Sequence, residues 1–261
     1  MCACTFATAV GAIAGCTAGG DAAPEPDLEA VQAGAETLID VGLATALAAS
    51  YFDFGVTLDL GLTDLELASA AGTTIERNLG GCGSATVTGL DIAVDFGASP
   101  GCALATGIDV TGTIAAEVSK LCCFQGSGFV LISLPLTDVS VDGRALAGTY
   151  TVRTPEPARI ALTAAGTGVT GIVDVVGSAE TLALSSPIWT ERTTPITKLG
   201  LRSVVWRRGD CYPSAGSVLI ERDPSPQTLS FTDATATTGV AALTVGTTTS
   251  DFTLPPYGTC P

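Results

Sequence analysis

The chain has 261 residues, of which 46% are hydrophobic and 14% are charged, a composition that excludes an intrinsically disordered protein. Its 26 acidic residues outnumber its 11 Lys and Arg, and the net charge of −15 excludes nucleic acid as a partner, because phosphate binding needs clustered basic side chains. The absence of His excludes the usual Ser–His–Asp triad and the common zinc ligand sets that contain His.

The first sixteen residues resemble a bacterial export signal that ends in a lipidation site. An apolar run at residues 6–13, too short to span a bilayer, leads into Ile13-Ala14-Gly15-Cys16. These four residues resemble the lipobox of bacterial lipoproteins, and the resemblance implies that residues 1–15 are a signal segment and that Cys16 is lipidated. Residues 1–5 contain no Lys or Arg, which an export signal normally has, so the alternatives are a start further upstream or a plain apolar tail.

The same resemblance implies a location for the protein. Bacterial lipoproteins carry several acyl chains on this Cys, and more than one chain makes a stable membrane anchor. Thr17 stands where an inner-membrane retention signal places Asp, so we expect the outer membrane, with the protein either periplasmic or exposed at the surface. Residues 16–26, which are rich in Ala, Gly and Pro, are predicted to be a flexible linker.

Residues 27–80 are predicted to form a helix-containing segment. Asp27 can cap a helix that runs to about residue 50, with an apolar stripe facing the rest of the protein and acidic residues on another face. A strand at residues 56–62 and a second helix from Asp64 follow. Eleven acidic residues precede Arg77, the first basic residue of the chain, and we interpret them as a solvated acidic surface.

From residue 81 onward the hydrophobic pattern changes to a period of two, which is typical of strands. Residues 108–118 alternate cleanly, and Asp142-Gly143 is the strongest short hairpin signal in the chain. Further short strands are predicted at 159–164, 169–176, 181–185, 187–193, 201–208, 216–222, 227–232, 240–246 and 251–254. The sequence therefore predicts a mainly β protein, with an antiparallel domain at 81–261 built as a sandwich, a barrel or a large curved sheet.

The cysteines support export. Of nine Cys, Cys2 and Cys4 would leave with the signal and Cys16 would be lipidated, so an even number remains for disulfides. The six candidates are Cys82, Cys102, Cys122, Cys123, Cys211 and Cys260. We predict Cys82–Cys102, which closes a hairpin-sized loop, and Cys211–Cys260, which ties the C-terminus to a late strand. The adjacent Cys122 and Cys123 would either form a vicinal disulfide with each other or bond to separate partners. Because the chain has no Cys-x-x-Cys spacing, no metal site is expected.

The β domain also resembles a recurrent pattern in uncharacterised bacterial surface lipoproteins. In those chains an Asp-Phe-Gly turn precedes a Gly-Cys pair, a strand that begins with Gly and a hairpin of the Asp-Gly…Gly-Thr type. The matching residues are Asp95-Phe96-Gly97, Gly101-Cys102, Gly107, Gly112-Thr113, Asp142-Gly143, Gly148-Thr149 and the closing Tyr257-Gly258-Thr259-Cys260. The resemblance implies a β-rich lipoprotein and carries no activity.

A basic and aromatic strand end is the candidate ligand-binding feature. It consists of Arg202, Trp206, Arg207 and Arg208, which could meet an acidic glycan or simply pack across strands with cation–π contacts. Arg208-Gly209-Asp210 spells an adhesion tripeptide, but the neighbouring Cys211 favours a turn pinned by a disulfide.

Two acidic residues on one strand are the other candidates for chemistry. Asp91 and Asp95 share a strand face, where they could act as paired carboxylates or bind calcium together. Their alternation with Ile92 and Val94 favours a solvent-facing edge instead. No catalytic residues and no cofactor are expected.

The most economical functional hypothesis is a lipid-anchored, non-enzymatic structural or binding protein of the bacterial envelope. The first alternative is a carbohydrate-binding or adhesin-like module, which a cleft lined by a Trp and facing carboxylates would favour. The second is a lipid carrier, which requires a hollow β-barrel or half-barrel. The partners are expected to be the membrane, through the lipid, and an unidentified surface glycan or protein.

Overall fold

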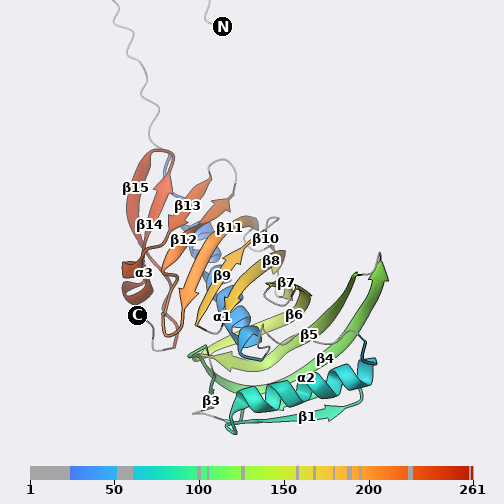
Figure 1. Cartoon of the computed structure of the whole chain (residues 1–261). Coiled ribbons are helices and arrows are strands. Elements are labelled where there is room, and N and C mark those ends of the chain that lie inside the picture. The colour runs from blue at the N-terminus through green and yellow to red at the C-terminus, as the bar shows by residue number, and fades with distance from the viewer. Residues whose placement is uncertain are drawn as a thin grey trace, which may run out of the picture.

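The computed structural model shows a mainly β protein that carries a helical segment before its strands (Figure 1). It describes residues 24–51, 61–98, 101–104, 106–124, 127–156, 159–166, 169–178, 180–186, 190–193, 196–222, 226–258 and 260. The lipidation site predicted at Cys16, the linker before Pro24 and most of the strand predicted at 56–62 lie outside these residues. Within them, no helix combines the length and the apolar character that crossing a membrane requires.

The described strands form one antiparallel sheet in which most neighbours in space are also neighbours in sequence. The order is β1-β2-β4-β5-β6-β7-β8-β10-β11-β12-β13-β14-β15; β3 pairs with β4, and β9 pairs with both β8 and β11. The strands are β1 (Ser84–Thr88), β2 (Asp91–Asp95), β3 (Cys102–Ala103), β4 (Asp109–Phe124), β5 (Ser127–Val141), β6 (Arg144–Glu156), β7 (Arg159–Gly166), β8 (Val169–Ser178), β9 (Thr181–Ser185), β10 (Thr190–Thr193), β11 (Ile196–Arg207), β12 (Ala215–Glu221), β13 (Gln227–Ser230), β14 (Val240–Val245) and β15 (Thr248–Thr253). Of the three predicted architectures, this is the large curved sheet (Figure 1).

Helix α1 (Leu28–Tyr51) lies against the inner side of the sheet, where it contacts β6, β8, β11 and β12 (Figure 1). All but four of residues 30–50 are buried, so the helix is enclosed and does not merely rest one stripe on the domain. The helix is rich in Ala, Gly and Leu. The small side chains of Ala and Gly let strands approach the helix on several sides. Helix and strands consequently share one hydrophobic core, which joins the predicted 27–80 segment to the β domain.

Acidic residues of α1, together with Asp27 just before it, pair with three arginines that are distant in the sequence. The pairs are Arg222 with Asp27 (3.6 Å) and Glu29 (2.7 Å), Arg192 with Glu36 (3.4 Å), and Arg144 with Asp40 (2.5 Å). Four of the eleven acidic residues thus have basic partners and still reach solvent, Glu29 most of all. Each pair is partly exposed, so it contributes modestly to stability, and its main effect is to fix the rotation of the helix.

The predicted second helix is confirmed as α2 (Asp64–Leu79), which packs on β1, β2 and β4. Thr63 caps it in a reciprocal box: its Oγ1 accepts from the Glu66 amide at 3.3 Å, and its own amide donates to the Glu66 carboxylate at 2.8 Å. Gly80 ends the helix in a left-handed conformation. A short third helix, α3 (Asp233–Thr238), connects β13 to β14 and was not predicted.

Candidate functional site

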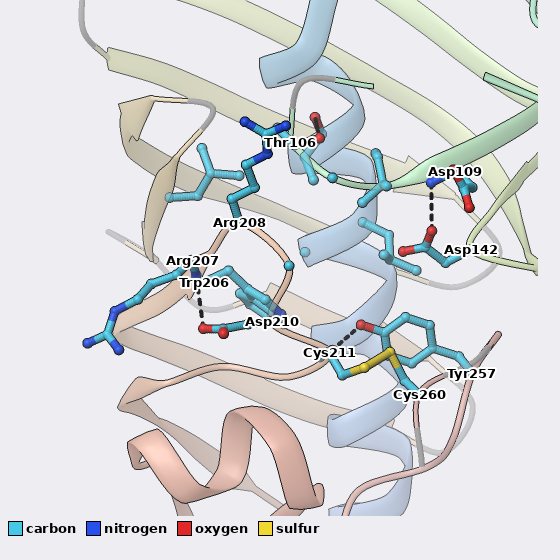
Figure 2. A pocket seen from close by; sticks show the side chains of 17 residues that line it. Thr106, Asp109, Asp142, Trp206, Arg207, Arg208, Asp210, Cys211, Tyr257 and Cys260 are labelled. Atoms are coloured by element: carbon cyan, nitrogen blue, oxygen red, sulfur yellow. Dashed lines mark hydrogen bonds between the residues drawn. A yellow bond between two sulfur atoms is a disulfide. The ribbon is translucent and has the colours of Figure 1, made fainter. Parts of the chain in front are cut away.

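A cavity of about 170 Å³ lies beside the C-terminal half of α1 (Figure 2). Its wall combines residues from α1, the segment before β4, the β5–β6 turn, the end of β11 and the last residues of the chain. The volume is below that of a typical drug-sized site but exceeds that of several water molecules. This cavity brings together more polar groups from remote parts of the sequence than does a second cavity, which lies between α2 and β1.

Trp206 forms one side of the cavity and rests on α1. A Cβ atom at Gly42 would lie 2.8 Å from the indole ring, so the ring position depends on a glycine in the helix. A β-bulge at Ser203, whose φ is 46°, turns the strand so that Trp206 faces inward. Arg202 precedes the bulge, is exposed and does not line the cavity, so the structure separates it from the other three predicted residues.

Arg207 and Arg208 line the cavity, but their guanidinium groups are engaged by carboxylates. Arg207 bonds Asp233 at 2.7 Å, and Arg208 bonds Glu180 at 3.0 Å. Figure 2 shows the Arg207 side chain extending away from the cavity. The basic patch expected from the sequence is therefore paired with acidic residues, which weakens its attraction for an acidic glycan.

The adhesion-like tripeptide forms a tight turn. The Asp210 amide donates to the Arg207 carbonyl at 3.0 Å, and the Asp210 carboxylate accepts from the Arg207 amide at 3.3 Å. Gly209 supplies the positive φ of 82° that the turn needs. The next residue, Cys211, is disulfide-bonded to Cys260, so the interpretation as a turn pinned by a disulfide is confirmed.

Two carboxylates, Asp109 and Asp142, meet at the opposite wall. The Asp109 amide donates to the Asp142 carboxylate at 2.7 Å, and the Asp142 amide donates to the Asp109 carbonyl at the same distance. Burial raises the pKa of the Asp142 carboxyl; the amide hydrogen bond from Asp109 opposes this shift, and the charge of Asp109 adds to it. The sequence identified Asp142 only as a turn residue, and no local signal could have placed it opposite Trp206.

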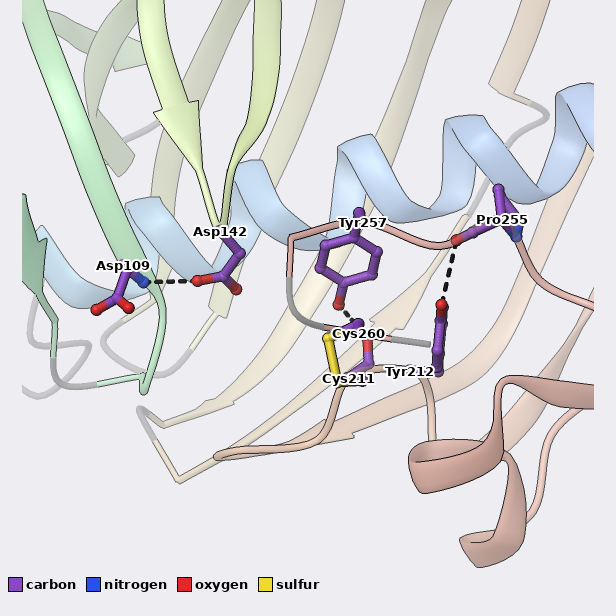
Figure 3. The surroundings of a disulfide bond; sticks show 7 residues. All are labelled: Asp109, Asp142, Cys211, Tyr212, Pro255, Tyr257 and Cys260. Atoms are coloured by element: carbon purple, nitrogen blue, oxygen red, sulfur yellow. Dashed lines mark hydrogen bonds between the residues drawn. A yellow bond between two sulfur atoms is a disulfide. The ribbon is translucent and has the colours of Figure 1, made fainter. Parts of the chain in front are cut away.

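The last described residues, 254–258 and 260, run beside α1, and two of them, Tyr257 and Cys260, line the cavity; we call this segment the C-terminal strap (Figure 3). The Tyr257 hydroxyl donates to the Cys211 carbonyl, and the Tyr212 hydroxyl donates to the Pro255 carbonyl at 3.2 Å. The two rings meet edge to face, with centroids 5.6 Å apart. Burial raises the pKa of Tyr257, as does the nearby charge of Asp142, so its phenol stays a hydrogen-bond donor at neutral pH.

Both predicted disulfides are present, with Cα–Cα distances of 5.2 Å for Cys82–Cys102 and 5.4 Å for Cys211–Cys260. Cys122 and Cys123 lie in β4, and their side chains are outside the described part of the structure. The solvent-facing interpretation of Asp91 and Asp95 is confirmed, because both are exposed on β2. Among the described residues, no group of three or more His, Cys, Asp or Glu could hold a metal ion.

The site offers hydrogen-bond acceptors, an aromatic surface and a small volume. No family model matches the chain, and neither a curated protein nor a solved structure is similar to it. The chemistry of the cavity itself therefore carries the functional argument.

Proposed function

We propose that this protein is a non-enzymatic binding module, held on the bacterial envelope by lipid on Cys16, whose cavity takes a small polar ligand. The disulfides Cys82–Cys102 and Cys211–Cys260 support export, since such bonds persist in oxidising compartments. The outer membrane remains the proposed location. A lipid carrier is the weaker alternative, because buried residues of α1 occupy the inner side of the sheet where an acyl chain would lie.

The ligand that fits best is a single amino sugar, a member of the carbohydrate class. One observation carries this proposal: the half-buried carboxylate of Asp142 and the ring of Trp206 line one small cavity, while Arg207 and Arg208 are paired with acidic residues. An ammonium group would compensate the desolvated carboxylate, sugar hydroxyls would donate to Asp109, and the apolar side of the sugar would pack on the indole. The net charge of −15 favours a cation over an anionic sugar.

Replacing Asp142 with Asn tests the charge without disturbing the turn. Asn tolerates the positive φ of 48° as readily as Asp does, and its amide oxygen can still accept from Asp109. We expect glucosamine affinity, measured by calorimetry, to fall by about tenfold to a hundredfold, the value of a charge-assisted hydrogen bond. Asp251→Asn, on exposed β15 outside the cavity, is the matched control and should bind as the wild type does.

The sign of the pKa shift separates this loss from unfolding. Because the pKa of Asp142 is raised in the folded state, its stabilising contribution is complete below the unfolded pKa and is lost as pH rises through the folded pKa. At neutral pH, Asp142→Asn should therefore leave the fold at least as stable.

Glucose and N-acetylglucosamine should bind more weakly than glucosamine. Equal affinity of both variants for glucosamine would contradict the proposed role of the carboxylate, and preferred binding of putrescine would replace the sugar with a simple amine.

The intact mass of the native, membrane-extracted protein tests the anchor. We expect residues 1–15 to be absent and acyl mass to be present on Cys16, because the lipobox resemblance implies both changes. A Cys16→Ser variant should accumulate without the added mass and leave the membrane fraction. An unmodified chain that retains residues 1–15 would refute the proposed anchor and with it the outer-membrane location.

A further inference from the structure

We infer that the Cys211–Cys260 disulfide is a redox latch on the cavity: its reduction releases the C-terminal strap and opens the site. The inference rests on the proposed binding function, because a latch matters only where the cavity holds a ligand. Two features carry it: the place of the disulfide in the cavity wall, and the contacts that the strap makes with Asp142.

The disulfide is part of the site itself. Cys211 and Cys260 both line the cavity and are both partly exposed, so a thiol that enters the cavity meets the sulfur atoms directly (Figure 2). A partly exposed disulfide is within reach of a reductant.

The Cys82–Cys102 disulfide provides the contrast within the same molecule. Cys102 is fully buried in β3, and Cys82, although exposed, lies two residues before β1, so both partners adjoin paired strands. Neither Cys82 nor Cys102 lines the cavity, so breaking that bond removes no wall of it. The two disulfides therefore have different expected roles, one joining strands away from the cavity and the other holding the C-terminal strap in the cavity wall.

The strap completes the binding wall next to Asp142. A Cβ on Gly258 would overlap the Asp142 carbonyl oxygen, so the strap and the β5–β6 turn are in direct backbone contact. Tyr257 fills the space between that turn and the disulfide, and its hydroxyl bonds to the carbonyl of Cys211 (Figure 3). One of the noncovalent attachments of the strap is thus made to the backbone of a disulfide partner.

The chemistry needs a dithiol reductant, such as a dithiol oxidoreductase of the envelope. A thiolate of the reductant attacks one sulfur of the disulfide, which forms a mixed disulfide and releases the other cysteine as a thiolate. The second thiol of the reductant then attacks the mixed disulfide and releases the remaining cysteine. The protein disulfide gains two electrons and two protons, and the reductant is oxidised to its own disulfide.

Hydrogen exchange of the full chain, with and without dithiothreitol, tests the latch without any ligand. Alkylation and mass spectrometry identify the cysteines that have been reduced. With Cys211–Cys260 reduced, the Cys260 amide, which donates to the Tyr257 carbonyl at 2.8 Å, should lose its protection, while amides of α1 and β14 keep theirs. Glucosamine affinity should fall by about tenfold, the loss expected when one hydrogen-bonded wall of a small site is removed.

A Cys211→Ala/Cys260→Ala variant should show the open behaviour without a reductant, and a Cys82→Ser/Cys102→Ser variant should still close and open with redox state. A strap that stays protected after its disulfide is reduced overturns the inference, and so does exchange that spreads over the whole protein, since the bond would then be purely structural. If the strap opens but neither redox state binds glucosamine, the release of the strap stands and the proposed ligand fails.

Discussion

Replacement of Gly112 by Ala is expected to lower the free energy of unfolding by about 3 kcal/mol or more. Gly112 lies in β4 at a φ of 97°, which side chains other than hydrogen rarely allow, and an added Cβ would sit 1.8 Å from the Asp138 carbonyl oxygen on β5. The clash is with backbone, so β4 and β5 would have to separate in the middle of the sheet. Urea denaturation of the purified variant measures the loss.

Gly89→Ala is the matched control for this effect. Gly89 also has a positive φ, of 65°, but nothing lies within 4 Å of the position where its Cβ would be. Its substitution should cost about 1 kcal/mol from backbone conformation alone. If the two variants lose the same stability, the close approach of Asp138 is not what requires a glycine at residue 112.

Truncation of Leu38 to Ala is expected to cost about 2–5 kcal/mol, the range for a fully buried leucine that leaves a cavity. Leu38 is 1% exposed, near the middle of α1, where the sheet encloses the helix. Leu28 on the same helix is 58% exposed, so Leu28→Ala should change stability by no more than about 0.5 kcal/mol. A cost below 1 kcal/mol for Leu38→Ala would show that the sheet does not close tightly on the helix.

The local features of the fold were predictable from the sequence. Asp142-Gly143 marked the β5–β6 hairpin because both residues tolerate the left-handed backbone of such turns. The start of α2 at Asp64 was predicted as well, and the residues that bracket the helix, Thr63 and Gly80, are local capping signals. The Cys211–Cys260 pairing was predicted because it ties the C-terminus to a late strand, which is one choice among the pairings that six cysteines allow.

The short helix α3 was missed for a physical reason. The helix has six residues. Of the ten positions 231–240, which include two flanking residues at each end, four are Thr, which favours strands over helices. The helix forms because Thr232 and Thr235 satisfy each other's backbone groups and Gly239 ends it. Capping outweighs propensity here, and only the resulting structure reveals that balance.

The candidate site could not be predicted, because its parts are distant in sequence and meet only through the curvature of the sheet. Trp206, one of the candidate ligand-binding residues, lines the cavity, but the bulge at Ser203 that separates it from Arg202 leaves no clear sequence signal. The partner of each acidic residue of α1 was equally hidden: Arg144 lies more than a hundred residues from Asp40. Side-chain alternation predicts which face a residue occupies, but not which remote strand faces it.

The direction of α1 has a consequence for how an anchored protein presents its cavity. Pro24, the first described residue, lies beside Gly246 in the turn between β14 and β15, and the chain then runs along α1 to Gly42 and Ala46 in the cavity wall. From Leu28 to Gly42 the helix rises by about 21 Å. With lipid on Cys16, the buried helix would hold the cavity away from the lipid headgroups. The cavity would then face solutes that diffuse in the surrounding compartment.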